Sequence, residues 1–223
     1  MDTSSASVRS SSRVERKRQQ ARLRIIAAAA DLLREKSADQ LTIADITAAA
    51  DVGHGTFYLH FKSKHDVLLP VLQEEAETLD AQLRASLQDE TDPAAIMGLS
   101  ARFMANHILG DDLWRWFLSS SGVPMDTIRM TLGRFSDRDY LAGVRSGRFR
   151  TRNPEMTAVF CFGGYVSALL QAMRAQDPRA LVDATAEALL ISLGIPEGDA
   201  IEIATRPLPT VSKDLATERG STS

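Results

Sequence analysis

Residues 42–64 read TIADITAAADVGHGTFYLHFKSK, and this stretch decides the fold of the first third of the chain. Thr42 and Asp45 have the spacing of a capping box, which predicts the start of a short helix. The next break, Asp51 to Gly53, contains two residues that tolerate the left-handed backbone of a tight turn. Helical spacing then resumes from His54 to Phe61. The stretch therefore predicts two short helices joined by a tight turn.

The second of these helices has two chemically different faces. Phe57 and Phe61 are four residues apart and share one face, which we expect to pack inward. The hydrogen-bonding residues that project elsewhere are His54, Thr56, Tyr58 and His60. A short helix anchored by aromatic rings and carrying polar groups on its front suits the major groove of DNA. Because helix-turn-helix patterns are also common in helical proteins that do not bind DNA, a plain packing motif is the alternative.

The same stretch resembles the DNA-binding domain of the TetR family of transcriptional repressors, whose pattern is close to T-x-x-x-I-A-x-x-A-G-V-S-x-G-T-x-Y-x-H-F-x-x-K. The matching residues are Thr42, Ile46, Ala50, Val52, Gly55, Thr56, Tyr58, His60, Phe61 and Lys64. The sequence departs from the pattern at Thr47, Asp51 and Gly53, where Ala, Gly and Ser are usual. We expect these departures to alter fine DNA contacts and to leave the motif intact.

The resemblance implies a role for each matched residue. Thr42, Tyr58 and Lys64 are expected to contact phosphates of double-stranded DNA. The residues expected at or near base edges are His54, Gly55, Thr56 and His60. Gly53, at the cap of the helix that carries them, is also expected to take part in DNA binding. The resemblance also implies a palindromic DNA operator, a small-molecule effector and a homodimer.

Composition and charge agree with an all-α DNA-binding protein. Apolar residues make up 44% of the 223 residues, which is enough for a core, and no alternating strand pattern is visible. The net charge of −3 alone argues against a nucleic-acid partner. However, residues 1–65 hold 11 Lys and Arg against 7 Asp and Glu, whereas the remainder holds 15 against 22. A basic N-terminal part suits phosphate contacts, although chance asymmetry on solvated faces would look the same.

Capping and breaking residues divide the chain into four parts. We expect a disordered arm over 1–12, a helix-turn-helix domain over 13–64, a helical ligand-binding and dimerisation domain over 65–206, and a loose tail over 207–223. Ser12 to Glu15 reads as the capping box of a first helix with a buried stripe of Leu23, Ile26, Ala30 and Leu33. The later helices are expected over 64–88, 92–110, 111–120, 124–145, 153–176, 177–194 and 196–205.

The last two long helices, over 153–176 and 177–194, are apolar on more than one face. A helix that is apolar all round is fully buried. Gly163 and Gly164 would let another helix approach closely. Near the end of a chain of this length, such helices favour a subunit interface, and TetR-family proteins are similar in forming homodimers through their last two long helices.

The predicted body also contains candidates for an effector pocket. Met and aromatic side chains suit adaptable apolar cavities, which favours an apolar or aromatic effector. The candidates are Phe103, Met104, His107, Trp114, Phe117, Met130 and Phe160. Each could equally be plain core, and His107 could be a satisfied core histidine.

We expect a cytoplasmic protein that is not an enzyme and that needs no cofactor. There is one cysteine, Cys161, and no apolar signal segment or membrane-spanning run is visible. G-x-S-x-G, P-loop and H-E-x-x-H motifs are missing, and the spacing of His54, His60 and His65 does not stack on one helical face, so no metal site is predicted. The leading hypothesis is a ligand-responsive repressor. The alternative is a helical-bundle enzyme or small-molecule carrier whose N-terminal part serves assembly.

Overall fold

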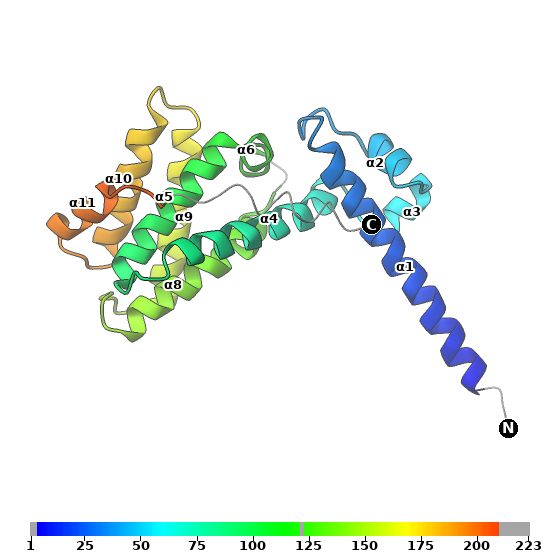
Figure 1. The fold of residues 1–223 in the computed structure, drawn as a ribbon, viewed down its shortest axis with the longest axis horizontal. Helices are drawn as coiled ribbons and strands as arrows, with labels where there is room; N and C mark the ends of the chain where they lie inside the picture. The colour runs from blue at the N-terminus through cyan, green and yellow to red at the C-terminus, as the bar shows by residue number, and fades with distance from the viewer. Residues whose placement is uncertain (1–3, 121–122, 210–223) are drawn as a thin grey trace. The chain divides into compact units, whose positions relative to one another are not determined.

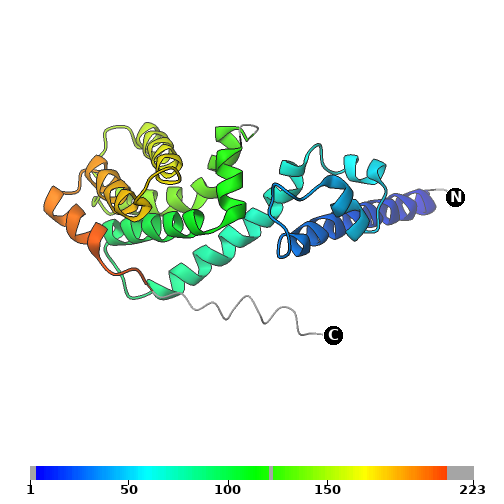
Figure 2. The ribbon, with the colours of Figure 1, turned by 90° about the horizontal axis from the view of Figure 1, so that it is seen from above.

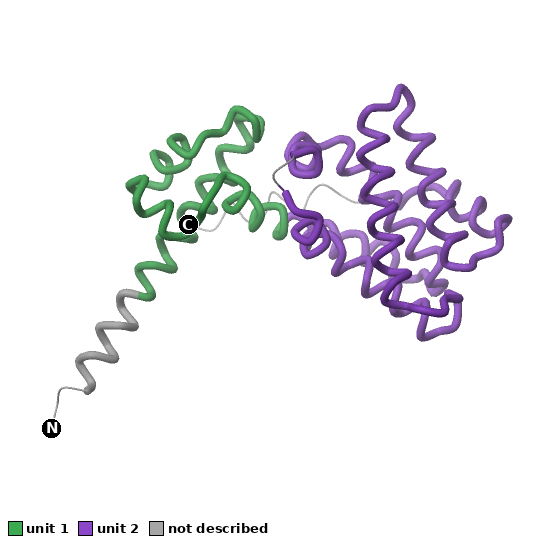
Figure 3. The backbone as a smooth tube through the Cα atoms, turned by 180° about the vertical axis from the view of Figure 1, so that it is seen from behind, with its two compact units in different colours: residues 1–74 green, residues 75–223 purple. Residues whose placement is uncertain are grey.

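The structure, a computed structural model, describes the backbone of residues 4–120 and 123–209, and every regular element in those ranges is a helix (Figure 1). This confirms the all-α prediction. The chain divides into an N-terminal unit, Met1–Glu74, and a C-terminal unit, Glu75–Ser223 (Figure 3). The division lies within α4 (Lys64–Ser86), ten residues beyond the domain boundary expected at residue 64.

The N-terminal unit contains α1 (Ser4–Leu32), α2 (Ile43–Ala49), α3 (His54–Tyr58) and the beginning of α4. Both short helices contact α1. The prediction that the first helix starts at Ser12 after a disordered arm was wrong for the described residues, because α1 already begins at Ser4. No Gly or Pro occurs between Ser4 and Leu32, so nothing in the backbone interrupts the helix. Residues 1–3 of the expected arm lie outside the described residues.

The predicted buried stripe of the first helix was out of register. Leu23 is 53% exposed. The face that is buried carries Ala21, Ile25, Ala28 and Ala29. Apolar residues occur on two faces of this helix, so periodicity alone did not decide between them. Small alanines on the buried face let α2 and α3 approach the helix closely.

The C-terminal unit contains the end of α4 and seven further α-helices with one π-helical segment. They are α5 (Pro93–Gly110), α6 (Asp112–Ser119), α7 (Met125–Ile128), the π-helical η1 (Arg129–Gly133), α8 (Arg134–Arg145), α9 (Pro154–Ala172), α10 (Pro178–Ser192) and α11 (Glu197–Thr205). The helix predicted over 124–145 is therefore interrupted by one π segment. Among the described residues, no helix combines the length and apolar character needed to cross a membrane.

Three predicted helix starts are confirmed in atomic detail. The side chains of Asp92, Asn153 and Asp177 each accept a hydrogen bond from a backbone N–H in the first turn that follows, at 3.0, 3.1 and 3.2 Å. Each is followed directly by a proline, whose missing N–H costs nothing in a first turn. These caps fix where α5, α9 and α10 begin.

Helix α5 is the centre of the C-terminal unit. It contacts α6, α8, α9, α10 and α11 (Figures 1 and 2). A core cluster gathers around its first half and contains Ala94, Ala95, Met97, Tyr140, Phe149, Leu190, Leu193, Ile195, Ala200 and Ile203. Gly143 on α8 is part of the same packing, because a Cβ added there would overlap the ring of Phe149. The sequence places its smallest residue where that ring needs space.

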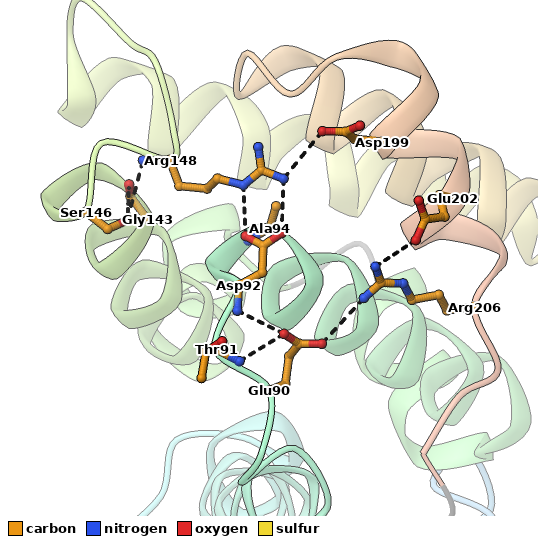
Figure 4. A network of polar contacts seen from close by, with 10 residues as sticks. All are labelled: Glu90, Thr91, Asp92, Ala94, Gly143, Ser146, Arg148, Asp199, Glu202 and Arg206. Carbon is orange, nitrogen blue, oxygen red and sulfur yellow. Dashed lines mark hydrogen bonds and ion pairs between the residues drawn. The ribbon is translucent and has the colours of Figure 1, made fainter.

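A network of ion pairs joins the N-terminus of α5 to the segments around it (Figure 4). Arg148 donates two hydrogen bonds to the carboxylate of Asp92, at 2.8 and 3.0 Å, and lies 3.6 Å from Asp199 on α11. Arg206 lies 3.4 Å from Glu90 and donates to Glu202 at 2.9 Å. Asp92 therefore both caps α5 and tethers the loop after α8.

Candidate nucleic-acid interface and helical-bundle cavity

The first helix of the motif starts with the predicted capping box. The Thr42 hydroxyl accepts a hydrogen bond from the backbone N–H of Asp45 at 3.1 Å, and the Asp45 carboxylate accepts from the backbone N–H of Thr42 at 3.0 Å. Lys36 donates to the same carboxylate at 3.0 Å. This arrangement ties α2 to the chain segment that follows α1 and fixes the entry to the motif.

The turn between the two short helices adopts the predicted backbone. Asp51 has a φ of 50°, and it is the one described non-glycine residue with positive φ. Aspartate tolerates this left-handed conformation better than most residues. Gly53 is the N-cap of α3 and contributes no side-chain hydrogen bond. The turn is therefore built as predicted, with a weaker cap on the second helix than a serine would give.

The second helix is shorter than predicted, because α3 ends at Tyr58, although hydrogen-bonded turns continue to Phe61. Its back is anchored as expected, since Phe57 is fully buried and Phe61 is 3% exposed, with ring centroids 5.7 Å apart. Tyr58 on the front is 56% exposed, and its ring meets Phe57 edge-on. Of the other predicted DNA-binding residues on this element, Gly53, His54 and Gly55 are exposed, and Thr56 and His60 are half-buried. The polar face is thus open to a partner.

The surroundings of His60 favour the neutral form of its imidazole. Burial lowers its pKa below 6.5, and the positive charges of Arg18 and Arg22 lower it further. Arg22 also lies over the ring of Phe61, 5.3 Å from its centroid. A neutral imidazole offers one donor and one acceptor, which suits a base edge better than a phosphate.

Lys64 has a structural contact that the sequence did not reveal. Its ammonium group donates to the carbonyl of Ala38 at 2.6 Å and to that of Asp39 at 3.4 Å. It therefore ties the start of α4 to the segment before α2. The expected phosphate role of Lys64 would have to be combined with this tether, and the same holds for Thr42, whose hydroxyl belongs to the capping box.

A cavity of about 90 Å³ lies inside the C-terminal unit. Its lining is mostly apolar and comes from α4, α5, η1, α8, α9 and α10. The apolar and aromatic lining residues are Ala76, Leu83, Met97, Ala101, Met104, Ile108, Leu132, Phe135, Ala158, Phe162, Leu189 and Leu193. A space of this size and character suits a small single-ring molecule.

Four charged side chains, which we call the charge cluster, are Asp80, Arg84, Arg138 and Asp139. Asp80, Arg84 and Asp139 line one edge of the cavity, and Arg138 lies beside them. Arg84 on α4 donates to Asp139 on α8 at 2.6 Å, and Arg138 on α8 donates to both oxygens of Asp80 on α4 at 2.8 Å. Burial raises the pKa of Asp80, but hydrogen bonds and charge attraction from Arg138 and Arg84 outweigh it and leave the pKa lowered. The cluster pairs two carboxyl groups with two guanidinium groups, so its formal charges balance.

Two tyrosines line the cavity, and their hydroxyl groups differ in hydrogen bonding. The hydroxyl of Tyr165 donates to the carbonyl of Ala101 at 2.7 Å, and burial raises the pKa of this phenol. The hydroxyl of Tyr140 is buried and has no hydrogen-bond partner among the described residues. A buried polar group without a partner costs free energy, so the Tyr140 hydroxyl is suited to bind a polar group of a molecule in the cavity.

The structure brings few of the predicted pocket residues together. Met104 lines the cavity, and the other six candidates do not. Phe103 packs beside Leu83, Leu87 and Leu99, and His107 pairs with Glu75. Trp114 and Phe117 pack edge-on in the core, whereas Met130 and Phe160 are 73% and 75% exposed.

The polar residues at the cavity, above all Tyr140 and the charge cluster, were not predicted from the sequence. Their sequence signal is the placement of Asp80 and Arg84 four residues apart on an otherwise apolar helix stripe, and of Asp139 beside Tyr140. Charged residues on an inward face need partners from another element. The partner of Arg84 lies 55 residues away in the sequence, so local patterns did not reveal it.

Comparisons with known proteins cover both units. Residues 25–71 match the family model "Bacterial regulatory proteins, tetR family", and residues 92–206 match "Tetracyclin repressor-like, C-terminal domain". Among curated proteins, the chain is 35% identical over 86 residues to the HTH-type transcriptional regulator TtgR of Pseudomonas putida, and 38% identical over 71 residues to the uncharacterised regulator YvdT of Bacillus subtilis (strain 168). These matches cover 38% and 31% of this chain, and the chain spans 41% and 36% of the length of the two relatives.

Solved structures extend the likeness to most of the chain. The crystal structure of RolR in complex with the ligand resorcinol is 33% identical, with a TM-score of 0.79, and the match covers 89% of this chain and all of RolR. RolR without ligand gives 31% identity and a TM-score of 0.74, with 85% of this chain and all of RolR covered. The lauroyl-CoA complex of Thermus thermophilus FadR, at 20% identity and a TM-score of 0.64, covers 85% of this chain and 99% of that chain and shares the fold.

We predict that Asp45→Asn lowers the midpoint of thermal unfolding at neutral pH. The Thr42 side chain, and then Lys36, lower the pKa of Asp45 from 3.8 to about 2. A carboxyl group with a lowered pKa in the folded state stabilises the fold above 3.8, and this contribution is lost as the pH falls through about 2. The difference in midpoint between wild type and variant therefore shrinks over that interval.

Asp31→Asn is the matched control, because Asp31 pairs with Arg34 on the exposed surface of α1. This substitution should change the midpoint little at any pH, since exposed ion pairs contribute little. A difference for Asp45→Asn that stays constant as the pH falls would contradict the role given to its charge.

Proposed function

Because this chain belongs to the TetR family of transcriptional regulators, we propose that it is a homodimeric repressor that leaves a palindromic DNA operator when a small hydroxylated aromatic molecule binds. TetR-family regulators are DNA-binding regulators rather than enzymes. The observation that carries the proposal is the cavity with the unpartnered Tyr140 hydroxyl, in a chain whose other unit is a helix-turn-helix. The proposed place of action is the cytoplasm, where the DNA is.

The proposed DNA contacts come from α3 and the residues around it. His54, Tyr58 and Gly55 are exposed on one side of this short helix, and its aromatic residues anchor the other side. In our proposal His54, Gly55, Thr56 and His60 approach base edges, and Tyr58 contacts a phosphate. Gly53 lets the backbone come near the DNA. Thr42 and Lys64 act mainly by holding the motif in shape, through the capping box and the tether to Ala38.

The proposed dimer interface is formed by α9 and α10. Large apolar side chains on these helices are exposed in the single chain, with Val159 at 45%, Phe160 at 75% and Ile191 at 43%. A Cβ added at Gly163 or Gly164 would have no neighbouring atom of the described residues within 4 Å, which leaves room for a second helix. Two copies would place two recognition helices ~34–36 Å apart for successive major grooves. Sedimentation of the DNA complex should give two chains per duplex, and one chain per duplex would contradict the dimer.

We predict that His54→Ala and Tyr58→Ala together weaken binding to a DNA fragment that the wild-type protein has selected from a random pool. Base and phosphate contacts contribute ~1–3 kcal/mol each, so the loss of two contacts should weaken binding roughly 30-fold or more. Both side chains are exposed, so the fold should be unaffected. Fluorescence anisotropy at two salt concentrations measures the change.

The control is Arg174→Ala, which removes an exposed positive charge from the C-terminal unit. It should leave affinity for the same fragment unchanged. Affinity that survives the double substitution on α3, or falls equally for Arg174→Ala, would contradict the proposed interface.

The proposed effector is a single aromatic ring with hydroxyl groups. The cavity volume and its apolar lining suit the ring. The unpartnered Tyr140 hydroxyl and the charge cluster supply donors and acceptors for hydroxyl groups. The similarity to RolR, a protein solved with resorcinol, supports the same class of molecule for this chain. Release requires that the effector bind the DNA-incompetent state more tightly than the DNA-bound state.

We predict that Tyr140→Phe weakens resorcinol binding about tenfold, because one hydrogen bond to a buried polar group is lost. The same substitution should leave thermal stability unchanged or raise it, since the hydroxyl has no partner among the described residues of the unliganded protein. Tyr165→Phe is the comparison, because it breaks the bond to the Ala101 carbonyl and should lower stability. Calorimetric titration and thermal unfolding measure the two effects.

Resorcinol affinity within twofold of wild type in Tyr140→Phe would contradict the role of that hydroxyl. If neither resorcinol nor any of a panel of mono- and dihydroxybenzenes binds, the proposed effector class is wrong.

A further inference from the structure

Three side chains with metal-binding atoms meet in the C-terminal unit, outside the cavity. They are Glu75 on α4, His107 in the last turn of α5, and Asp111, which caps α6. One ligating atom from each lies within 4.8 Å of the other two. Nε2 of His107 is 2.9 Å from Oε1 of Glu75. None of the three lines the cavity, so this cluster is separate from the proposed effector site.

The cluster is supported from behind by a buried tryptophan. The ring of Trp114 is fully buried and meets the His107 ring edge-on, with centroids 6.4 Å apart. The backbone N–H of Trp114 donates to the Asp111 carboxylate at 3.0 Å. Two of the three ligands are therefore held by the same residue, and a metal site needs such support to keep its ligands in place.

The charges of the cluster are not balanced by basic side chains. The cluster contains two acidic side chains and one imidazole, so acidic groups predominate in it. Within the described parts of the chain, the one cationic group paired with either carboxylate is His107 itself. The side chains of His107 and Glu75 are 26% and 31% exposed, so ions from solvent can reach them. A divalent cation would neutralise the cluster.

We propose that Glu75, His107 and Asp111 form a binding site for a divalent first-row transition-metal ion, with Zn²⁺ as the best fit. An imidazole ligand favours such ions over Mg²⁺ and Ca²⁺, and carboxylates complete a nitrogen–oxygen set. Bonds of ~2.0–2.1 Å in a tetrahedral site place ligand atoms about 3.3 Å apart. The widest gap between ligand atoms would therefore have to close by at most about 1.5 Å when the ion binds. Water fills the remaining position.

A bound ion would link α4 to the junction of α5 and α6 within the C-terminal unit. No metal site was predicted from the sequence, because only histidines close together in sequence were considered. Here the ligands come from positions 75, 107 and 111, and the one histidine among them was predicted to face the effector. The proposal holds whether or not the cavity binds an aromatic effector.

The test is a titration of the full-length, tag-free protein with Co²⁺, which has visible absorption and quenches nearby tryptophan fluorescence. One ion per chain should bind saturably, with quenching that persists in Trp116→Phe and is reversed by Zn²⁺. Glu75→Gln and Asp111→Asn should each weaken binding at least tenfold. Both keep a side-chain oxygen in place, so the contact to His107 and the cap of α6 can be retained.

Asp112→Asn is the matched control, because Asp112 is the exposed neighbour of Asp111 and is not part of the cluster. It should bind Co²⁺ within twofold of wild type. The proposal is overturned if Co²⁺ does not bind, or if Glu75→Gln, Asp111→Asn and His107→Asn all bind within twofold of wild type. Binding close to wild type in all three variants would mean that Co²⁺ binds elsewhere, for instance at the histidines of the N-terminal unit.

Discussion

The charge cluster of Asp80, Arg84, Arg138 and Asp139 constrains how two helices of the C-terminal unit, α4 and α8, are joined. It joins α4 to α8 by hydrogen bonds of 2.6–2.8 Å and forms one edge of the cavity. The Asp139 side chain is 8% exposed, so removing its partner would leave a carboxylate in a place that water hardly reaches. Breaking such a pair typically costs ~3–5 kcal/mol, whereas the intact pair adds little to net stability. The cluster therefore specifies how α4 sits against α8 more than it strengthens the fold.

This constraint has a consequence for regulation. On one side, the cavity is bordered by charged groups that are already hydrogen-bonded to one another. The hydroxyl of Tyr140, in contrast, has no hydrogen-bond partner among the described residues. A ligand with hydroxyl groups can form a hydrogen bond with the Tyr140 hydroxyl. It can also compete for the hydrogen bonds within the charge cluster. Helix α4 carries Asp80 and Arg84 and, in the same continuous helix, begins next to the helix-turn-helix at Lys64. Any ligand that changes the pairing of Asp80 or Arg84 acts directly on this helix.

Local signals in the sequence predicted the parts of the fold that local physics decides. The capping residues Asp92, Asn153 and Asp177 marked three helix starts correctly, because a cap involves atoms only a few residues apart. The turn at Asp51 was predicted for the same reason. The buried face of α1 was not, since Leu23 and Ile25 are equally apolar and only the position of α2 and α3 decides between them. Tertiary packing carries that information.

The residues that line the cavity could not be predicted for a related reason. Met104 was identified, but Trp114 and Phe117 became core, and Phe160 remained on the surface. A large apolar side chain has the same local pattern in a pocket, a core or an interface. Tyr140, Asp139 and Glu75 gain their meaning from partners on other helices. Residue type and spacing thus predicted which chemistry the unit contains, and three-dimensional packing decided where it lies.

In the proposed mechanism, effector binding and operator binding oppose each other, and each must weaken the other equally. Resorcinol is titrated calorimetrically into the free protein and into its complex with the selected DNA fragment, and operator affinity is measured with and without saturating resorcinol. We expect resorcinol to weaken operator binding by a factor of ~5–150 and the operator to weaken resorcinol binding by the same factor. Equal resorcinol affinity for free and DNA-bound protein would contradict the proposed mechanism.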